Sequence, residues 1–520
     1  MILQVVEQNQ ILTKWYVLLA SALLLWIGYS KLRVEYGKRK LGAKEAPYLP
    51  GSNFFFSRNP VVVLRYKAEG KMIHLIWDAF KVGGESFRIK IAAVTLFATL
   101  DPENIKALSA TQFNDFALGF RNAHFKPLLG NGIFTLDGAG WKHSRAMLRP
   151  NFSREQVGHV QALERHLQSL AKHIRKHKGE GFDIQDLFFR LTVDTSTEFL
   201  FGESIYGLRD ETINEFPPES FERSSEFFNS FTKSQNYLAT RAWMQNWYWL
   251  INSKEFRDSN EVVHNFSRFY VNKALKATPQ EAEERSKGGY VFLYELVKET
   301  RDPQVLQDQL LNIMIAGRDT TAGLLSFTMY ELSRNPQIWE KLKTELYNKF
   351  GYGENSRVGE ITLESLKSCE YLKWVINEVL RLYPSVPVNY RVAIRDTTLP
   401  RGGGADGRLP TFIRKGQVIG YVISATHRNE QYFGKDADVF RPERWGDKNM
   451  KPGWSYLPFN GGPRICLGQQ FALAEAYYII TRIAQMFPNL LSADTSNIYP
   501  PRMDSQLTLS LTDGSWVHMT

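Results

Sequence analysis

The sequence predicts a mainly α-helical protein that has a small β region and is preceded by one membrane-spanning helix. Long amphipathic patterns typical of helices dominate the chain, for example over residues 155–178 and 304–334. Stretches typical of strands are few and short, such as residues 87–100 and 417–424. A chain of 520 residues suggests two domains or one unusually large one, and no internal repeat divides it.

The first 30 residues predict the membrane helix. Residues 15–29 read WYVLLASALLLWIGY without a charge, and extending the run back to residue 11 admits only Lys14. A helix over residues 11–29 would span roughly 28 Å, which matches the hydrocarbon core of a bilayer. Several basic residues follow this run and only Lys14 precedes it, so the positive-inside rule places the N-terminal tail outside and the remainder in the cytosol. A cleaved signal peptide is the competing interpretation, but its small-residue site, Ala20-Ser21-Ala22, lies inside the apolar run.

The predicted organisation is linear. It comprises a lumenal tail over residues 1–10, an anchor over 11–29, a basic and proline-rich linker over 30–50 and one large domain over 51–520. The prolines of the linker prevent it from being helical throughout. The glycine-rich segment at residues 402–407 resembles a phosphate loop only superficially, because no lysine–serine pair follows it. We expect a flexible hairpin or loop insertion there.

Charge and cysteine content narrow the class of protein. The net charge of +10 and the pI near 9.2 are compatible with nucleic acid, an anionic membrane or an acidic protein partner. No zinc-finger spacing, RNA-binding signature or lysine-rich tail supports nucleic acid, so we expect none as a partner. The two cysteines, Cys369 and Cys466, cannot form a disulfide scaffold, so nothing requires an oxidising compartment.

The strongest chemical signal is the segment FNGGPRICLG at residues 459–468. Its glycines and proline prevent regular structure before Cys466, and a helical pattern over residues 469–486 begins just after it. Cys466 is therefore expected at a helix N-terminus, where free N–H groups and the helix dipole favour a thiolate. A lone thiolate suits the axial position of a haem rather than a four-ligand zinc site. Cys369 has no such surroundings and is expected to be an inert buried residue.

This segment resembles the signature of the cytochrome P-450 family, F-x-x-G-x-R-x-C-x-G. The match consists of Phe459, Gly462, Arg464, Cys466 and Gly468. The resemblance covers the chain from about residue 47 to the end and implies the cytochrome P-450 fold, with haem b between a central helix and the cysteine loop. It implies Cys466 as the iron ligand, Arg464 as a partner of a haem propionate, Phe459 as a cofactor contact and Gly468 as a point of close approach to the macrocycle.

A second motif, AGRDTT at residues 316–321, looks like the oxygen-binding stretch of the family's central helix. The resemblance implies that Gly317 leaves room beside the haem, while Thr320 and Asp319 deliver protons. Without the cysteine motif, the same residues would equally suit a helix whose threonines bond back to their own turn.

A third motif is Glu378-Val-Leu-Arg381, which by itself would suit a surface ion pair worth roughly 0.2–0.5 kcal/mol. In the family this pair is buried and joined by a later arginine, matched here by Arg444. Breaking such a buried triad leaves uncompensated charge. Trp445 stands where the family more often has phenylalanine.

A fourth resemblance concerns the haem propionates. Trp141 and Arg145 look like the family's W-x-x-x-R helix that holds one propionate, and Arg391 is expected to hold the other. His143 and His427 could be mistaken for iron ligands, but structural roles are expected because a thiolate already occupies one face of the iron.

The resemblance implies a monooxygenase that inserts one atom of O₂ into a substrate C–H bond. The chain has no dinucleotide-binding fingerprint and no flavin domain, so a separate NADPH-dependent diflavin reductase on the same membrane is implied. Basic residues around the thiolate face would attract its acidic surface. The expected location is the endoplasmic reticulum membrane, with a single span, contact with membrane lipid and the catalytic domain facing the cytosol.

The substrate is expected to be small and lipophilic. The sequence RLYPSVPVNYRVA from Arg381, followed by LPRGGGADG, resembles the yeast branch that hydroxylates n-alkanes and fatty acids at the terminal carbon. Terminal attack requires a narrow channel, for which residues 386–388 and three phenylalanines are candidates: Phe113, Phe116 and Phe120. The aromatic-rich segment over residues 221–269, with its tryptophans, suits either an apolar channel that opens at the membrane or a helix-packing face.

Three alternatives remain open at this point. The chain could be a haem-thiolate monooxygenase of another lipophilic substrate, such as a sterol or a secondary metabolite. It could be a haem-thiolate isomerase or dehydratase that does not use O₂, although Asp319 and Thr320 argue against this. It could also be a non-catalytic haem protein, such as a gas sensor or an electron carrier.

Overall fold

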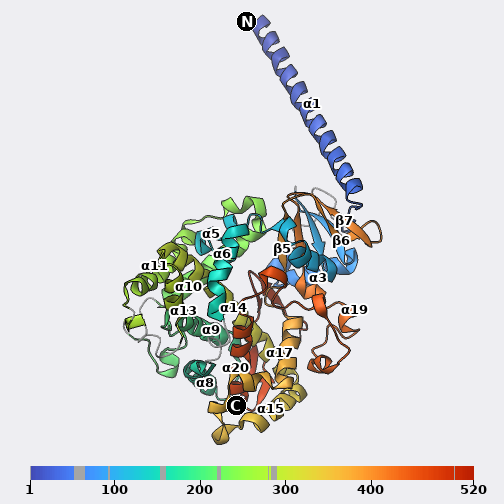
Figure 1. Ribbon diagram of the computed structural model, residues 1–520. Coiled ribbons are helices and arrows are strands. Elements are labelled where there is room, and N and C mark those ends of the chain that lie inside the picture. Colours follow the sequence, from blue (N-terminus) through green and yellow to red (C-terminus); the bar gives the residue numbers. More distant parts are fainter. Residues whose placement is uncertain are drawn as a thin grey trace. The chain divides into compact units, whose positions relative to one another are not determined.

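The computed structural model describes residues 2–51, 65–91, 94–152, 160–218, 224–278, 280–282, 290–496 and 498–520 (Figure 1). The chain forms two compact units. Unit 1 comprises Met1–Ser57, Val82–Ala117 and Arg391–Gly420. Unit 2 comprises Arg58–Lys81, Leu118–Tyr390 and Tyr421–Thr520.

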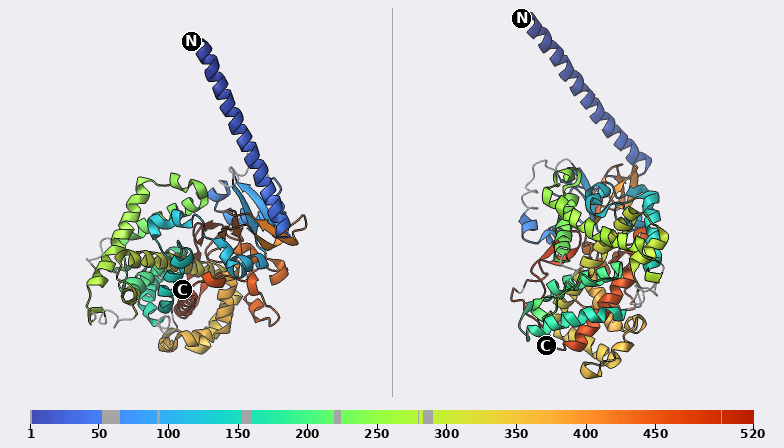
Figure 2. Two further views of the ribbon diagram at one scale, coloured as in Figure 1. Left: turned by 45° about the horizontal axis from the view of Figure 1, so that its top comes forward. Right: turned by 90° about the vertical axis from the view of Figure 1, so that its left-hand side faces the viewer.

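Unit 1 begins with helix α1, Ile2–Lys40, which is one continuous helix in Figures 1 and 2. Its part Trp15–Lys40 is long and apolar enough to cross a membrane, with a mean hydropathy of 1.5 in its most apolar window, and that window is not buried in the protein. The helix is thus longer than the predicted anchor. Near its end, Gly37 allows close packing, because a Cβ there would lie 2.8 Å from the ring of Phe412.

Two small sheets complete unit 1. The five-stranded sheet has the order β1-β2-β8-β5-β3, and a second sheet pairs β6 with β7. The strands are β1 Ser86–Ile91, β2 Val94–Thr99, β3 Phe116–Ala117, β5 Asn389–Ala393, β6 Thr397–Gly403, β7 Leu409–Ile413 and β8 Val418–Tyr421; a short helix, α4, covers Pro102–Lys106. The stretch predicted as strand over residues 87–100 is the antiparallel hairpin β1–β2. The glycine-rich segment connects β6 to β7, which confirms the predicted hairpin.

Unit 2 contains most of the helices. Its helices are α5 Arg121–Leu129, α6 Gly138–Leu148, α8 Glu164–Lys176, α9 Ile184–Phe201, α10 Ser224–Met244, α11 Lys254–Lys276, α13 Phe292–Glu299, α14 Pro303–Arg334, α15 Pro336–Phe350, α16 Leu363–Lys367, α17 Glu370–Leu382, α18 Ile423–Thr426, α19 Glu430–Phe433 and α20 Gln469–Met486. Most of α3, Met72–Gly83, also belongs to unit 2. Its strands are β4 Phe182–Asp183, β9 Leu490–Ser492, β10 Met503–Ser505, β11 Leu509–Leu511 and β12 Trp516–Met519, in sheets of order β4-β12-β9 and β10-β11.

Helix α14 forms the centre of unit 2 and contacts α9, α11, α17 and α20. It begins where the sequence predicts, because the Asp302 side chain accepts hydrogen bonds from two N–H groups of the first turn and Pro303 fits the first helical position. The bounds of α20 coincide with the predicted residues 469–486. Helix α8 accounts for part of the predicted helix over 155–178, and residues 153–159 lie outside the described residues.

The tryptophans at the end of α10 and in the turn that follows it are exposed, although Phe227 and Phe231 earlier in α10 are buried. Helix α10 is followed by a short 3-10 helix, η7 Gln245–Leu250, and then by α11. Trp243, Trp247 and Trp249 are 47%, 59% and 59% exposed. These three rings therefore do not form a helix-packing face within the described part of the chain, whereas Phe221 lies outside it.

Glu378 in α17 lies at the centre of a buried charge network. Its carboxylate accepts hydrogen bonds from Arg381 at 2.8 and 2.9 Å and from Arg444 Nε at 2.8 Å, and none of the three side chains is more than 2% exposed. The N–H of Arg441 and the indole N–H of Trp445 each donate at 3.0 Å. The expected triad is confirmed, and Trp445 adds a bond to it that phenylalanine could not make.

This network predicts different costs for two substitutions of its donors. Arg444→Met should lower the free energy of unfolding by about 3–5 kcal/mol, because it leaves a buried carboxylate short of positive charge. Trp445→Phe should cost about 1–2 kcal/mol, because it removes one hydrogen bond and leaves both arginines in place. Urea unfolding followed by tryptophan fluorescence measures both values. Equal costs for the two variants would contradict this account of the network.

Candidate haem site

The loop that carries Cys466 is held by its own backbone. The N–H of Cys466 donates to the carbonyl of Phe459 at 3.0 Å, and that of Ile465 donates to the carbonyl of Gly462 at 3.0 Å. Gly462 has a φ of +69°, a conformation that glycine adopts without strain. Helix α20 starts three residues after Cys466 with Gly468 as its N-cap. The sequence prediction of a cysteine beside a helix N-terminus is therefore confirmed.

The thiol of Cys466 is the exposed one of the two cysteines, and that of Cys369 is buried. Protein atoms packed around the Cys466 thiol raise its pKa by desolvation, whereas the N–H of Gly468 and the charge of Arg145 lower that pKa. Burial raises the pKa of Cys369 to about 11, which fits the inert role expected for it. Desolvation outweighs the other two effects, so the pKa of Cys466 is raised and the thiolate expected from the helix N-terminus is not favoured by the protein alone. A metal bound at Cys466 would favour the thiolate, because the ligand is the deprotonated form.

Cys466 opens on a pocket of about 930 Å³ between its own loop and α6. The pocket has an apolar lining that includes Trp141, Phe152, Pro463 and Leu467, and three cations: Lys142, Arg145 and Arg149. Its volume lies within the range of cofactor sites. The combination suits a large apolar group that carries acidic substituents.

The donor set fits haem. In the part of the chain that the structure describes, no group of three or more His, Cys, Asp or Glu side chains is gathered to hold a metal ion. A single thiol can complete a metal centre only if the other ligands come with the metal, as they do in a macrocycle. At Gly468, a Cβ would meet only the ring of Phe152, at 3.7 Å. Packing within the protein therefore does not require glycine there, and close approach of a cofactor at Gly468 stays a prediction.

The structure brings Trp141, Arg145 and Arg464 together. The guanidinium of Arg464 lies 4.4 Å from the centre of the Trp141 ring, and that of Arg145 lies 5.9 Å from it. Arg145 donates to the carbonyl of Ile465 at 3.0 Å, and Arg464 donates to the carboxylate of Asp137 at 2.7 Å. The pairing of these arginines with propionates stays a prediction. A propionate bound by Arg464 would share that guanidinium with the Asp137 carboxylate.

Asp137 is a residue that sequence reasoning missed. It occupies the N-cap position of α6 but makes no side-chain capping bond. Its carboxylate instead accepts from the N–H of Leu118 at 2.9 Å and from Arg464. An aspartate at a helix start would be interpreted as a cap, so no sequence signal distinguishes this role.

The remaining predicted cofactor contacts are placed individually. Phe459 is partly buried against the core of unit 2. Arg391 lies in β5, belongs to unit 1 and is buried. Its role toward a propionate stays a prediction.

The second motif forms part of α14. Thr320 Oγ1 donates to the carbonyl of Ala316 at 2.5 Å, which is the local bond expected of a helical threonine. The carboxylate of Asp319 lies 3.3 Å from Nε of Arg318 and accepts a bond from Gln235 at 2.7 Å. A Cβ on Gly317 would lie 3.3 Å from Ser196 Oγ, so glycine at this position allows α9 to pack closely. No sequence pattern indicates the contact of Gln235 or this packing role of Gly317.

The two candidate histidines take different places. His427 is fully buried, with Nδ1 at 3.1 Å from the carbonyl of Arg381 and Nε2 accepting from the N–H of Leu457 at 2.7 Å. Burial lowers the pKa of His427 to about 3, so the ring is neutral. This confirms the structural role expected for it. His143 is exposed on α6.

The site and the fold together define a haem-thiolate protein. The sequence profile of the cytochrome P450 family matches residues 55–510 of the chain. The chain belongs to this family, and it is therefore a haem-thiolate monooxygenase.

Its similarity to individual members is high over almost the whole length. The chain is 57% identical to cytochrome P450 52A13 of Debaryomyces hansenii over 98% of both chains. It is 57% identical to cytochrome P450 52A3-B of Candida maltosa over 97% of both chains. It is 54% identical to cytochrome P450 52A1 of Candida tropicalis, over 98% of this chain and 94% of that one. Haem is therefore the cofactor of this enzyme.

Cys466→Ser should abolish thiolate ligation, because an alcohol is neutral at pH 7 and is a poor iron donor. The reduced, carbon monoxide-bound protein should lose the red-shifted Soret band typical of a thiolate ligand. Cys369→Ser is the matched control and should keep this band. A band that survives in Cys466→Ser would show that another residue is the ligand.

Proposed function

We propose that this monooxygenase hydroxylates long-chain n-alkanes or fatty acids at the terminal carbon. The observation that carries the chemistry is the exposed Cys466 thiol at the start of α20, on a pocket with an apolar lining and basic rim. The resemblance to the yeast alkane and fatty-acid hydroxylases supports the substrate class, as does the identity of 54–57% to three members named 52A.

The segment after α17 offers a wall for a narrow channel. Ser385 Oγ donates to the carbonyl of Thr320 at 3.3 Å, so residues 385–388 begin beside Asp319 and Thr320 of α14. Val386 and Val388 are partly buried there. Three phenylalanines are candidates for the other side of such a channel; of these, Phe120 fits less well because it is 56% exposed, while Phe113 and Phe116 stay candidates. Residues 386–388 therefore carry the channel proposal.

Haem, when bound, supplies the activation of O₂ that allows an oxygen atom to enter a C–H bond. The chain supplies the protons. The Asp319 side chain is 16% exposed and can exchange protons with water. The Thr320 hydroxyl can accept a hydrogen bond while it donates one, so it can act as a proton relay on α14.

The electrons are proposed to come from an NADPH-dependent diflavin reductase. Lys142 and Arg149 are exposed basic residues next to the Cys466 loop, which suits an acidic partner surface. Helix α1 is proposed to be a single-pass anchor in the endoplasmic reticulum membrane, with the catalytic domain in the cytosol. The basic residues that end α1, Lys38, Arg39 and Lys40, support this orientation.

The regiochemistry is testable with dodecane and dodecanoic acid as probes, with a reductase and NADPH. Oxygen should enter at or next to the terminal carbon, although terminal C–H bonds are the stronger ones, because the channel admits only the methyl end. Gas chromatography with mass spectrometry identifies the products. Hydroxylation spread along the middle of the chain would refute the terminal assignment. Turnover without O₂ or NADPH would instead indicate an isomerase.

Thr320→Ala should leave haem binding intact and divert NADPH consumption into hydrogen peroxide. The yield of product per NADPH should fall by about tenfold or more, since a positioned proton donor contributes at least that much to such steps. Thr320→Ser keeps the hydroxyl and should retain most of the coupling. Equal yields in wild type and Thr320→Ala would remove Thr320 from the proton route.

A further inference from the structure

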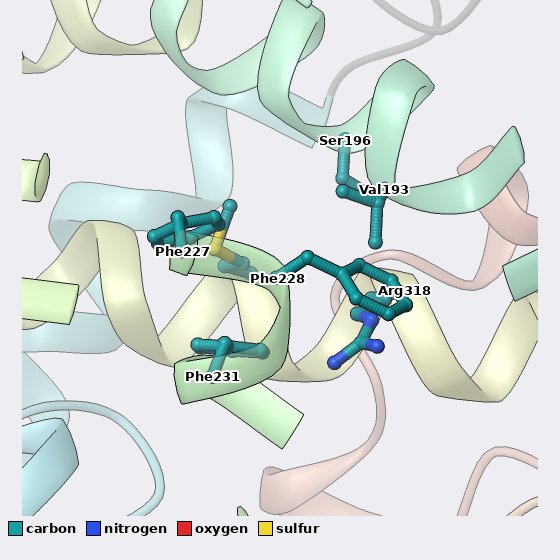
Figure 3. A pocket seen from close by; sticks show the side chains of 7 residues that line it. Val193, Ser196, Phe227, Phe228, Phe231 and Arg318 are labelled. Atoms are coloured by element: carbon teal, nitrogen blue, oxygen red, sulfur yellow. The ribbon is translucent and has the colours of Figure 1, made fainter. Parts of the chain in front are cut away.

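Arg318 of α14 is a buried cation held by helix α10. Its side chain is 4% exposed. Its guanidinium donates to Gln235 Oε1 at 3.0 Å and to Thr232 Oγ1 at 2.8 Å, and it lies 4.5 Å from the centre of the Phe228 ring. Figure 3 shows Arg318 and Phe228 directed towards one another beside a small cavity. A buried guanidinium requires such acceptors, because each unpaired N–H group would carry a desolvation cost.

Gln235 does more than satisfy this cation. Its Nε2 donates to Asp319 Oδ2 at 2.7 Å, while Asp319 Oδ1 lies 3.3 Å from Arg318 Nε. The amide of Gln235 thus accepts a hydrogen bond from Arg318 and donates one to Asp319, the next residue after Arg318. Gln235 is itself 6% exposed.

The mutual contacts of Arg318, Gln235 and Asp319 require an amide at position 235, in the orientation observed. The opposite orientation of the amide would set its NH₂ group against the guanidinium and its oxygen against the carboxylate, so both contacts would be repulsive. A glutamate could accept from Arg318 but could not donate to an ionised Asp319. A leucine could do neither. Only an amide of this length at position 235 can accept from Arg318 and donate to Asp319 Oδ2 at the same time, while Asp319 Oδ1 remains in its ion pair with Arg318.

We infer that Gln235 is a positioning residue for Asp319 in proton delivery. It holds the carboxylate in one orientation on α14 and makes that orientation depend on α10, a helix outside the haem-binding motifs. The inference rests on the role proposed above for Asp319. Gln235 itself neither gains nor loses a proton. Its amide only orients the Asp319 carboxylate, which exchanges protons with water.

Two single variants of the full-length haem protein separate positioning from packing. Gln235→Glu keeps the acceptor for Arg318 but removes the donor to Asp319. Thr232→Val removes an acceptor of Arg318 but leaves Asp319 untouched. If Gln235 only packs α10 against Arg318, Thr232→Val should be the more harmful variant. If Gln235 positions Asp319, Gln235→Glu should be the more harmful variant.

The expected result with dodecanoic acid is a fall in product per NADPH of about threefold to tenfold for Gln235→Glu, which corresponds to the loss of one hydrogen bond. Thr232→Val should stay within about twofold of wild type. The dissociation constant of dodecanoic acid, from its spectral shift, should be unchanged in both variants. If wild type and Gln235→Glu give equal product per NADPH while Asp319→Asn gives less, the inference about Gln235 is overturned and the proposed role of Asp319 stands. Unchanged coupling in Asp319→Asn overturns the proposed role of Asp319 and this inference together.

A second readout does not depend on turnover. In a crystal structure of Gln235→Glu, the Asp319 carboxylate should turn away from residue 235, because two carboxylates repel one another. The double variant Gln235→Glu with Asp319→Asn restores one donor and one acceptor, so side chain 319 should return to its contact while coupling stays low. An Asp319 side chain that keeps its wild-type position in Gln235→Glu overturns the inference.

Discussion

The charge of Glu378 is buried, and the fold around Cys466 depends on how that charge is balanced. Two arginines, one backbone N–H and one indole N–H converge on this carboxylate. These donors tie α17 to residues 441–445 of the chain, which lead to the cysteine loop. From there the hydroxyl of Tyr456 donates to the carbonyl of Asn377 at 3.1 Å, and the N–H of Leu457 donates to His427. The neutralised Glu378 carboxylate and these two hydrogen bonds together hold the segment that leads to Cys466.

The local elements near the site follow from local signals. Asp302 and Pro303 define the start of α14, and the glycines before Cys466 followed by an apolar periodicity define the start of α20. Glu378 and Arg381 are three residues apart on a helix, so their contact also follows from the sequence. Arg444 can be linked to them only through the resemblance to the family, because it is 66 positions from Glu378.

The polar contacts of the site could not be predicted in the same way. Arg464 binds Asp137 across 327 positions of the chain, and Gln235 binds Asp319 across 84 positions. Neither pair leaves a periodic pattern, because each depends on the packing of separate helices. Gly317 illustrates the same limit. The sequence indicates a place where a side chain is excluded, and only the structure shows that Ser196 of α9 fills that space.

The neutral ring of His427 has a consequence for acid tolerance. In the unfolded chain this histidine is protonated near pH 6.5, whereas in the folded chain its lowered pKa delays protonation until about pH 3. Between these values acidification favours the unfolded chain by up to about 1.4 kcal/mol for each pH unit. Stability from this group is therefore complete above pH 6.5 and declines as the medium becomes more acidic. The histidine that supports the cysteine loop is therefore one group through which acid weakens the fold around the site.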